Sequence, residues 1–266
     1  QMRSEEFHTK IWRVSGMVGT IEALTSRLET IGDLSDSDRA ALNSIPIHIS
    51  SIPRGTEIVA DGEIATSCCL VIEGYVYRSK LRPDGQRQIF SLHPAGDIPD
   101  LHSLHLEKMD HNLVAMSDCT VGRMDHRDVR EAIEDRPSLT ALLWRDTLID
   151  AAAFRAWMLM LGAAEALERM AHLFCEIYTR AMMAGLTEGN SFRLPLTQSD
   201  LSDILGISVV HANRTLQDLR SRRLLDFDQH VVTILQWEQL RSLARFDPSY
   251  LHYLDRRAGR VDPAKM

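Results

Sequence analysis

The spacing of hydrophobic and polar positions changes twice along the chain, and each change marks a different type of structure. Between Ile47 and Met124, short apolar runs alternate with turn residues, among them "PRG", "DGE" and "RPDGQ". A Pro-Asp-Gly turn between two alternating runs is typical of a β-hairpin. Strands this short and this evenly spaced predict a small barrel or roll.

After Met124 the apolar spacing becomes helical. The stretch "DHRDVREAIEDRP" predicts a short helix that ends before Pro137, and a long helix follows up to Gly162. Such a helix could be buried against its own domain, but it has more apolar surface than a small roll can cover. We therefore expect a symmetric seam between two copies of the helix. Leu142, Ile149 and Ala156 recur every seven residues, with Arg145, Ala152 and Leu159 between them, and we place these six residues in the seam.

The run from Leu196 to Leu225 has the pattern of two short helices joined by a tight turn. Thr197 can cap the first helix, Gly206 can adopt the left-handed conformation that ends it, and Ser208 can cap the second. The following "LLDFDQHVVTI" predicts a short hairpin. An ordinary helical hairpin is the alternative, but the whole pattern is that of a winged helix-turn-helix, whose second helix enters the major groove of double-stranded DNA.

The outward face of the second helix carries residue types that can read bases. Valine methyl groups can contact thymine, and Asn and Arg can form paired hydrogen bonds with purines. The candidate DNA-contacting residues are Thr197, Ser208, Val209, Val210, His211, Asn213, Arg214 and Gln217. Three further arginines, Arg220, Arg222 and Arg223, are expected to act on phosphates or on the wing.

Charge is distributed unevenly. The formal net charge of −7 argues against a general nucleic-acid binder. Residues 191–266 carry 11 Lys and Arg against 9 Asp and Glu, whereas the rest of the chain carries 19 against 28. This balance suits a DNA-reading module attached to an acidic body. No apolar run reaches the roughly 18 residues of a membrane helix, and no signal peptide or CxxC spacing is present, so we expect a reduced cytoplasmic protein without a membrane partner.

Five motifs, in this order, resemble the Crp/Fnr family of bacterial transcription regulators: "IPRGTEIVADGE", "DGQRQIF", "PAGDIPDL", "LGxxxAxER" and "LTQSDLSDILGISVVHANRTLQDLR". The resemblance spans roughly Leu34 to Leu240. It implies an α+β fold with an N-terminal cyclic-nucleotide-binding-like β-roll (a jelly roll), a long dimerisation helix and a C-terminal winged helix-turn-helix. It also implies a homodimeric regulator rather than an enzyme, with two recognition helices about one DNA turn apart on a palindromic operator. RNA polymerase is a further implied partner of an activator.

The resemblance also divides the chain. Residues 1–33 form an N-terminal extension that we expect to be partly helical. Residues 34–136 form the effector roll with flanking helices, and residues 137–162 form the dimerisation helix. The DNA-binding domain and a C-terminal tail occupy residues 163–266.

The recognition helix departs from the family pattern. Members that prefer the best-known site have Arg-Glu where this chain has Val209 and Val210, whereas the later arginine is kept as Arg214. Thr197, Ser208 and His211 fall where family members contact phosphates. DNA binding is therefore implied, but the family's G·C-reading pair is replaced by residues suited to thymine methyl groups.

The effector pocket departs further. Cyclic-nucleotide-binding members use a Gly-Glu loop and an Arg-Ser pair that holds the phosphate. Here Gly96-Asp97 keeps an acidic group for a ribose hydroxyl, Pro99 lacks an N–H, and His111-Asn112 replaces the Arg-Ser pair. We therefore expect no cyclic AMP binding. We also expect no iron–sulfur cluster, because no cysteine precedes Cys68, and we predict no other cofactor. The sequence does not identify a small-molecule effector. The candidate pocket residues are Gly96, Asp97, Ile98, Asp100, His111 and Asn112.

Histidines gather near this pocket and leave two alternatives open. His93, His102, His105 and His111, with Glu107, could serve a metal-, haem- or redox-sensing regulator, and His102 and His105 would share a face if their segment were helical. Their spacing, however, is not that of a metal motif. A cupin-like metalloenzyme would also have a roll and such histidines, but it would not account for the long helix or the winged helix.

Overall fold

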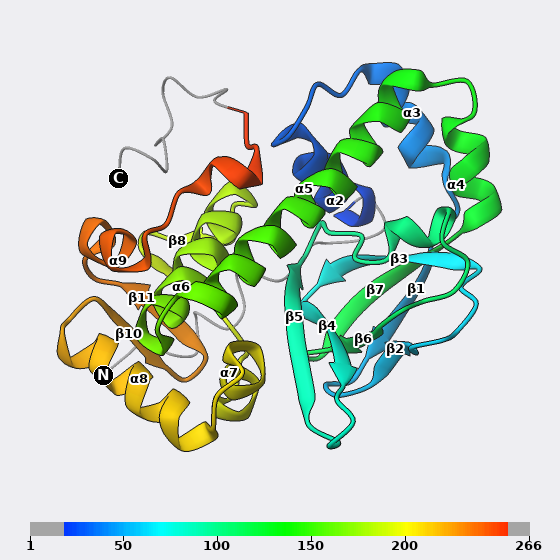
Figure 1. The fold of residues 1–266 in the computed structure, drawn as a ribbon. Coiled ribbons are helices and arrows are strands. Elements are labelled where there is room, and N and C mark those ends of the chain that lie inside the picture. The colour runs from blue at the N-terminus through cyan, green and yellow to red at the C-terminus, as the bar shows by residue number, and fades with distance from the viewer. Residues whose placement is uncertain (1–18, 255–266) are drawn as a thin grey trace.

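The computed structural model describes residues 19–254, so the expectations for residues 1–18 and 255–266 lie outside the described residues. Two helices, α2 (Gly19–Glu29) and α3 (Asp36–Ser44), precede a roll of two antiparallel sheets (Figure 1). The first sheet has the order β1 (His48–Ile52), β7 (Cys119–Asp125), β3 (Ser67–Glu73). The second has the order β2 (Glu57–Val59), β6 (Asn112–Ala115), β4 (Tyr75–Leu81), β5 (Arg87–Pro94). The roll predicted from the strand pattern is confirmed.

The central hairpin of the roll forms where the Pro-Asp-Gly turn predicted it. Strands β4 and β5 pair from Tyr75 with Pro94 to Leu81 with Arg87. Gly85 closes the turn with a φ of 79°, a conformation that glycine adopts without steric cost, and its N–H donates to the Arg82 carbonyl at 2.9 Å.

One long helix, α5 (Pro137–Ala163), runs between the roll and the C-terminal domain (Figure 1). It follows η1 (Leu101–Leu104) and the short helix α4 (His126–Ile133), and it has Pro137 in its first turn, where the missing N–H breaks no helical hydrogen bond. Among residues 19–254, neither α5 nor any other helix combines the length and apolarity that crossing a bilayer requires.

The C-terminal domain is a winged helix-turn-helix. Helix α6 (Ala166–Met183) is followed by β8 (Thr187–Glu188), β9 (Ser191–Arg193), α7 (Gln198–Leu205) and α8 (Val209–Ser221). Strands β10 (Leu225–Asp228) and β11 (Val231–Ile234) form the wing through a two-residue turn in which Gln229 and His230 both have positive φ. Helix α9 (Trp237–Ala244) and η2 (Pro248–Leu251) complete the domain. The predicted fold class is thereby confirmed.

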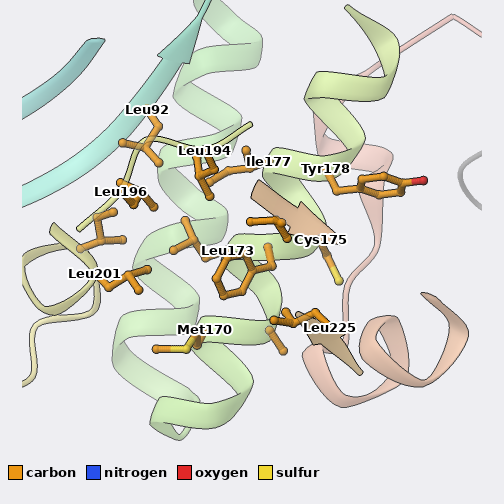
Figure 2. Close-up of a cluster of buried hydrophobic side chains, with 14 of the residues drawn as sticks. Leu92, Met170, Leu173, Cys175, Ile177, Tyr178, Leu194, Leu196, Leu201 and Leu225 are labelled. Atoms are coloured by element: carbon orange, nitrogen blue, oxygen red, sulfur yellow. The ribbon is translucent and has the colours of Figure 1, made fainter. Parts of the chain in front are cut away.

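The roll and the DNA-binding domain share one hydrophobic core. Helix α6 points Met170, Leu173 and Ile177 into it, and Leu92 of β5 lies in the same cluster as Leu194 (Figure 2). Large apolar side chains from the roll and from the DNA-binding domain are buried in this core. Their burial stabilises the contact between the two domains, and each Å² of apolar surface removed from water contributes about 25 cal/mol. The DNA-binding domain is therefore packed directly onto the roll in this conformation.

Charged side chains border this contact. Arg87 of β5 donates to Asp200 and Asp203 of α7, both at 2.8 Å, and Arg54 donates to Asp200 at 2.8 Å. Gln88 adds a hydrogen bond to the Asp203 carbonyl at 2.7 Å. The first helix of the helix-turn-helix is thus held against the β4–β5 hairpin.

Candidate functional site

The predicted turn of the helix-turn-helix is built by its caps. The Thr197 hydroxyl accepts from the Asp200 N–H at 3.1 Å, and the Asp200 carboxylate accepts in return from the Thr197 N–H at 2.9 Å. Gly206 ends α7 with a φ of 64°, and the Ser208 hydroxyl accepts from the His211 N–H at 3.2 Å to start α8. The helix ends predicted at these residues are confirmed.

One face of α8 points away from the rest of the molecule. Val210, Arg214 and Gln217 are spaced for one helical face and are exposed, Val210 to 70%. Val209 is exposed beside them. Arg214 forms no ion pair with any residue of the described range, whereas the apolar residues of the opposite face, Ala212, Leu216 and Leu219, are buried. An unpaired guanidinium beside two valines can meet both base edges and methyl groups.

Other predicted DNA-contacting residues already have partners in the chain. Asn213 is half-buried and donates to the Gln198 side chain at 2.6 Å, so its amide bridges α7 and α8. Thr197 and Ser208 serve as caps, and His211 is exposed in the first turn of α8.

The arginines after this face are also partly engaged. Arg220 pairs with Asp226 and Arg222 with Asp218, both at 2.8 Å. Arg223 lies in the turn before the wing with a φ of 55°. Because these pairs are exposed, they are weak and can exchange for phosphate.

A small cavity lies where the roll, α2, α5 and α6 meet. It measures about 30 Å³ as space open to the centre of a water molecule, enough for about two waters. Asp97 is at its edge and is surrounded by donors: Arg27 Nε at 3.3 Å, an Arg180 guanidinium nitrogen at 2.5 Å and His93 Nδ1 at 3.1 Å. These partners come from α2, α6 and β5, so one carboxylate connects three parts of the fold.

The remaining charges of this cavity neutralise one another. Arg78 of β4 donates to Asp150 at 2.6 Å and to the Pro99 carbonyl, and Arg27 also pairs with Asp146 at 2.8 Å. Asp146 and Asp150 lie one turn apart on α5. Arg27, Arg78 and Arg180 are thus balanced by Asp97, Asp146 and Asp150, and we refer to these six residues as the junction network.

The junction network shifts the pKa values of Asp97 and of the neighbouring His93. Burial alone would raise the pKa of Asp97, but the Arg180 guanidinium, the His93 hydrogen bond and the Arg27 charge hold that pKa well below its ordinary value. Burial and the charge of Arg78 lower the pKa of His93 to about 4. At neutral pH, Asp97 is therefore charged and His93 is neutral.

The structure does not bring all of the predicted effector-pocket residues together. Asp97 and Ile98 line the cavity, but the Asp97 carboxylate is fully engaged by its three partners and faces no space for a ribose. Gly96 packs against α2, where an added Cβ would lie 2.7 Å from the Ala23 carbonyl oxygen. The expectation that Asp97 offers its carboxylate to a ribose hydroxyl is therefore wrong for this conformation.

Three further members of that predicted set lie outside the cavity lining. Asp100 is buried and accepts from the Cys69 N–H at 2.7 Å, and its burial raises its pKa to about 7. Asn112 starts β6 and accepts from the Asp61 N–H at 2.6 Å. His111 is buried on the roll, where its Nδ1 bonds to Asp110 at 2.6 Å.

The histidines do not form one cluster. His93 bonds to Asp97 of the junction network, and His105 is exposed just after η1 ends at Leu104, so His102 and His105 do not lie in one helical segment. His102 instead lies beside His111, with ring centroids 5.3 Å apart. Burial and Arg78 lower the pKa of His102 to about 4 and also lower that of His111.

Burial suppresses the reactivity of three of the four cysteine thiols. All four are free and buried. Burial raises the pKa of the thiols of Cys68, Cys69 and Cys175, which keeps them protonated and unreactive.

Helix α5 has one covered and one uncovered face, and the covered one includes the centre of the predicted seam. Ile149 is 4% exposed and packs in the core beneath α2, as does Leu142, which presses on Gly32; Ala152 is buried too. These three residues are therefore not available to a second copy. Arg145 and Leu159 are exposed, and Ala156 is half-buried. Seven-residue spacing identified a row of apolar residues along the helix. It could not show that α2 would cover this row and leave the neighbouring row of the same helix exposed.

The uncovered face of α5 is largely apolar, although the exposed Arg155 lies at the coiled-coil position between Ala151 and Met158. Trp144, Leu148, Met158 and Leu159 are exposed, Leu148 to 52% and Met158 to 69%. Ala151 falls between them at coiled-coil spacing. We call Trp144, Leu148, Ala151 and Met158 the α5 stripe. An apolar surface of this length is characteristic of an interaction face.

A roll with an enclosed charged junction, a long helix with an apolar face and a winged helix with an open recognition face together define a two-domain DNA-binding regulator. The sequence matches the Crp-like helix-turn-helix domain family over residues 168–243 and the cyclic nucleotide-binding domain family over residues 49–136. The chain belongs to the Crp/Fnr family of transcription regulators.

Named relatives agree with this assignment. The chain is 27% identical over 204 residues to the nitrogen fixation regulation protein FixK of Rhizobium meliloti, covering 74% of this chain and 88% of that one. It is 25% identical over 218 residues to the transcriptional activatory protein AadR of Rhodopseudomonas palustris, covering 82% and 89%. Among solved structures, FixK2 from Bradyrhizobium japonicum is similar with a TM-score of 0.68 and 25% identity, covering 75% of this chain and 98% of that chain. These relatives are transcription regulators, not enzymes.

Proposed function

We propose that the protein acts as a homodimer that recognises a palindromic operator through α8 of each copy. The observation that carries this proposal is the open face of α8, on which Val209, Val210, Arg214 and Gln217 are exposed together and Arg214 has no ion-pair partner in the described range. In a two-fold dimer, two such helices fit successive major grooves about one DNA turn apart. As an activator, which is what AadR is named, it would also contact RNA polymerase.

The α5 stripe supports the dimer. It leaves large apolar side chains in contact with water on a single helix face, and a second copy of the same helix is the self-complementary partner that two-fold symmetry supplies. Packing of the stripe against its symmetry mate would bury Leu148 and Met158 and fix the distance between the two recognition helices.

Arg214→Ala is expected to relax sequence preference at one base pair in each half-site. A guanidinium that takes both acceptors of a guanine contributes about 1–3 kcal/mol of discrimination, and the alanine variant loses that contact alone. Selection from a randomised operator library gives the motif for each variant. Arg222→Ala is the matched control, because Arg222 pairs with Asp218 beyond the open face; it should keep the motif, weaken binding to all sequences alike and lower the salt dependence of binding. A wild-type motif with uniformly weaker binding for Arg214→Ala would instead make Arg214 a phosphate contact.

Cyclic nucleotides are not the proposed switch. The space at the junction accommodates about two waters, and the arginines that border it are bound to aspartates rather than free for a phosphate. His111 and Asn112, which replace the family's phosphate-binding pair, offer no bidentate cation and point their hydrogen bonds elsewhere.

Isothermal titration of the full chain with cyclic AMP and cyclic GMP is expected to show no binding at physiological concentrations. The same samples should bind operator DNA with unchanged affinity when either nucleotide is added. Saturable binding of a nucleotide, with a matching rise in operator affinity, would show that the junction network opens to admit it and would overturn this part of the proposal.

A further inference from the structure

A carboxylate and two imidazoles converge on the wall of the roll, away from the junction network. His102 follows β5 in η1, and Asp110 and His111 precede β6. One nitrogen of each imidazole and one carboxylate oxygen of Asp110 all lie within 4.8 Å of one another. Neither the recognition face nor the α5 stripe uses any of the three, so their convergence is not explained by DNA binding or by dimerisation.

His111 supplies the second observation. The residue is 5% exposed, and its Nδ1 bonds to Asp110 at 2.6 Å, but its buried Nε2 has no hydrogen-bond partner among the described residues. Leaving a buried polar atom unpaired costs about 1–3 kcal/mol. A ligand that takes up imidazole lone pairs at this position would remove that cost.

We propose that His102, Asp110 and His111 bind a first-row transition-metal ion of the Zn²⁺, Co²⁺, Ni²⁺ or Fe²⁺ class. Two imidazoles and one carboxylate suit these borderline ions better than Mg²⁺ or Ca²⁺, which prefer oxygen alone. Three protein ligands leave coordination positions for water or a small exogenous ligand. The Asp110 side chain is 82% exposed and gives an ion a path from solvent, while the neighbouring Arg78 charge is neutralised by Asp150.

Ring contacts connect this site to the long helix. The His111 ring lies edge-on to Phe90 at 5.8 Å between centroids, and Phe90 contacts Phe154 of α5 at 5.8 Å. The Arg78 guanidinium lies over the same Phe154 ring at 5.5 Å. Fixing the His111 ring by metal coordination therefore acts on packing against α5, the helix proposed to hold the dimer. The site itself rests on the roll alone and does not depend on the proposed DNA contacts.

The test is a titration of the full-length, chelator-stripped protein with Co²⁺, followed by its ligand-field absorption and then by displacement with Zn²⁺. Wild-type protein should develop the spectrum at one equivalent per chain. His102→Ala and His111→Ala should abolish it, and Asp110→Asn, whose side chain is exposed, should bind Co²⁺ more weakly than the wild type. His105→Ala is the matched control, because His105 is exposed three residues from His102 and outside the cluster; it should bind as wild type.

The results separate the site from its proposed effect. No Co²⁺ spectrum in wild-type protein, or an equal spectrum in His102→Ala, His111→Ala and wild type, would overturn the metal site. Circular dichroism verifies that each variant is folded. If a histidine variant does not fold, the comparison of Asp110→Asn with wild type still tests the metal site. Operator affinity is then measured with and without Zn²⁺. A change in affinity that occurs in wild type but not in Asp110→Asn supports the connection to α5. Equal affinities with and without Zn²⁺ in wild type would overturn that connection, while the Co²⁺ titration still decides whether the metal site exists.

Discussion

In sedimentation, the Leu148→Glu variant is expected to be a monomer under conditions in which the wild-type protein is a dimer. Leu148 is half-exposed at the middle of the α5 stripe, so the variant keeps the chain's own core intact and places two carboxylates opposite each other in the seam. Without the linked second recognition helix, the operator is held through one half-site. The lost effective concentration should weaken operator binding by about 10²- to 10⁴-fold.

The same substitution at an exposed leucine far from α5 gives the control. Leu81 ends β4 and is more exposed than Leu148, so Leu81→Glu should remain dimeric and bind operator normally. A Leu148→Glu variant that remains dimeric with wild-type operator affinity would show that the α5 stripe is not the seam. Ile149→Asp cannot serve in this test, because Ile149 is enclosed beneath α2 and a charge there unfolds the roll instead.

Local signals in the sequence were sufficient for most of the fold. The Pro-Asp-Gly turn, the cap at Thr197, the glycine at position 206 and the short wing hairpin each depend on residues close together in the chain. The structure has each of them in place. These local signals predicted a roll, a long helix and a winged helix-turn-helix, and the resemblance to the Crp/Fnr family implied how the three combine into one fold class. The open face of α8 could be predicted as well, since helical spacing alone separates it from the buried side.

Contacts between distant segments could not be predicted in this way. The α5 seam was assigned to Leu142 and Ile149 because the sequence does not show that α2 covers that side of the helix. The junction network joins Arg27, Asp97 and Arg180, which are far apart in the sequence and carry no shared pattern. One local signal was available: Asp146 and Asp150, four residues apart on one face of a largely apolar helix, indicate buried cationic partners.

Asp97→Asn is expected to lower the free energy of unfolding by about 3 kcal/mol. Removal of one partner from a buried ion pair costs about 3–5 kcal/mol, because the opposite charge stays buried without compensation. The lower end applies here, since Arg27 keeps Asp146 at 2.8 Å and Arg180 keeps Glu176 at 3.6 Å. Asparagine has the same shape, so the change tests charge rather than packing. Urea unfolding followed by circular dichroism measures the difference.

The pH dependence of this difference identifies its origin. The pKa of Asp97 is held well below its ordinary value of 3.8, so its contribution to stability is fully present above about pH 4 and is lost as the pH falls through the lowered pKa. The difference in free energy of unfolding between wild type and Asp97→Asn should therefore be constant from about pH 5 to about pH 8, because this range lies about one unit or more above the ordinary pKa. The difference should narrow in strong acid. Asp84→Asn removes an exposed pair with Arg82 and should cost less than about 1 kcal/mol at every pH. An equally small effect for Asp97→Asn would mean that the roll, α2 and α6 are held together by their apolar core alone, and that the junction network contributes no net stability to the contact between the effector roll and the DNA-binding domain.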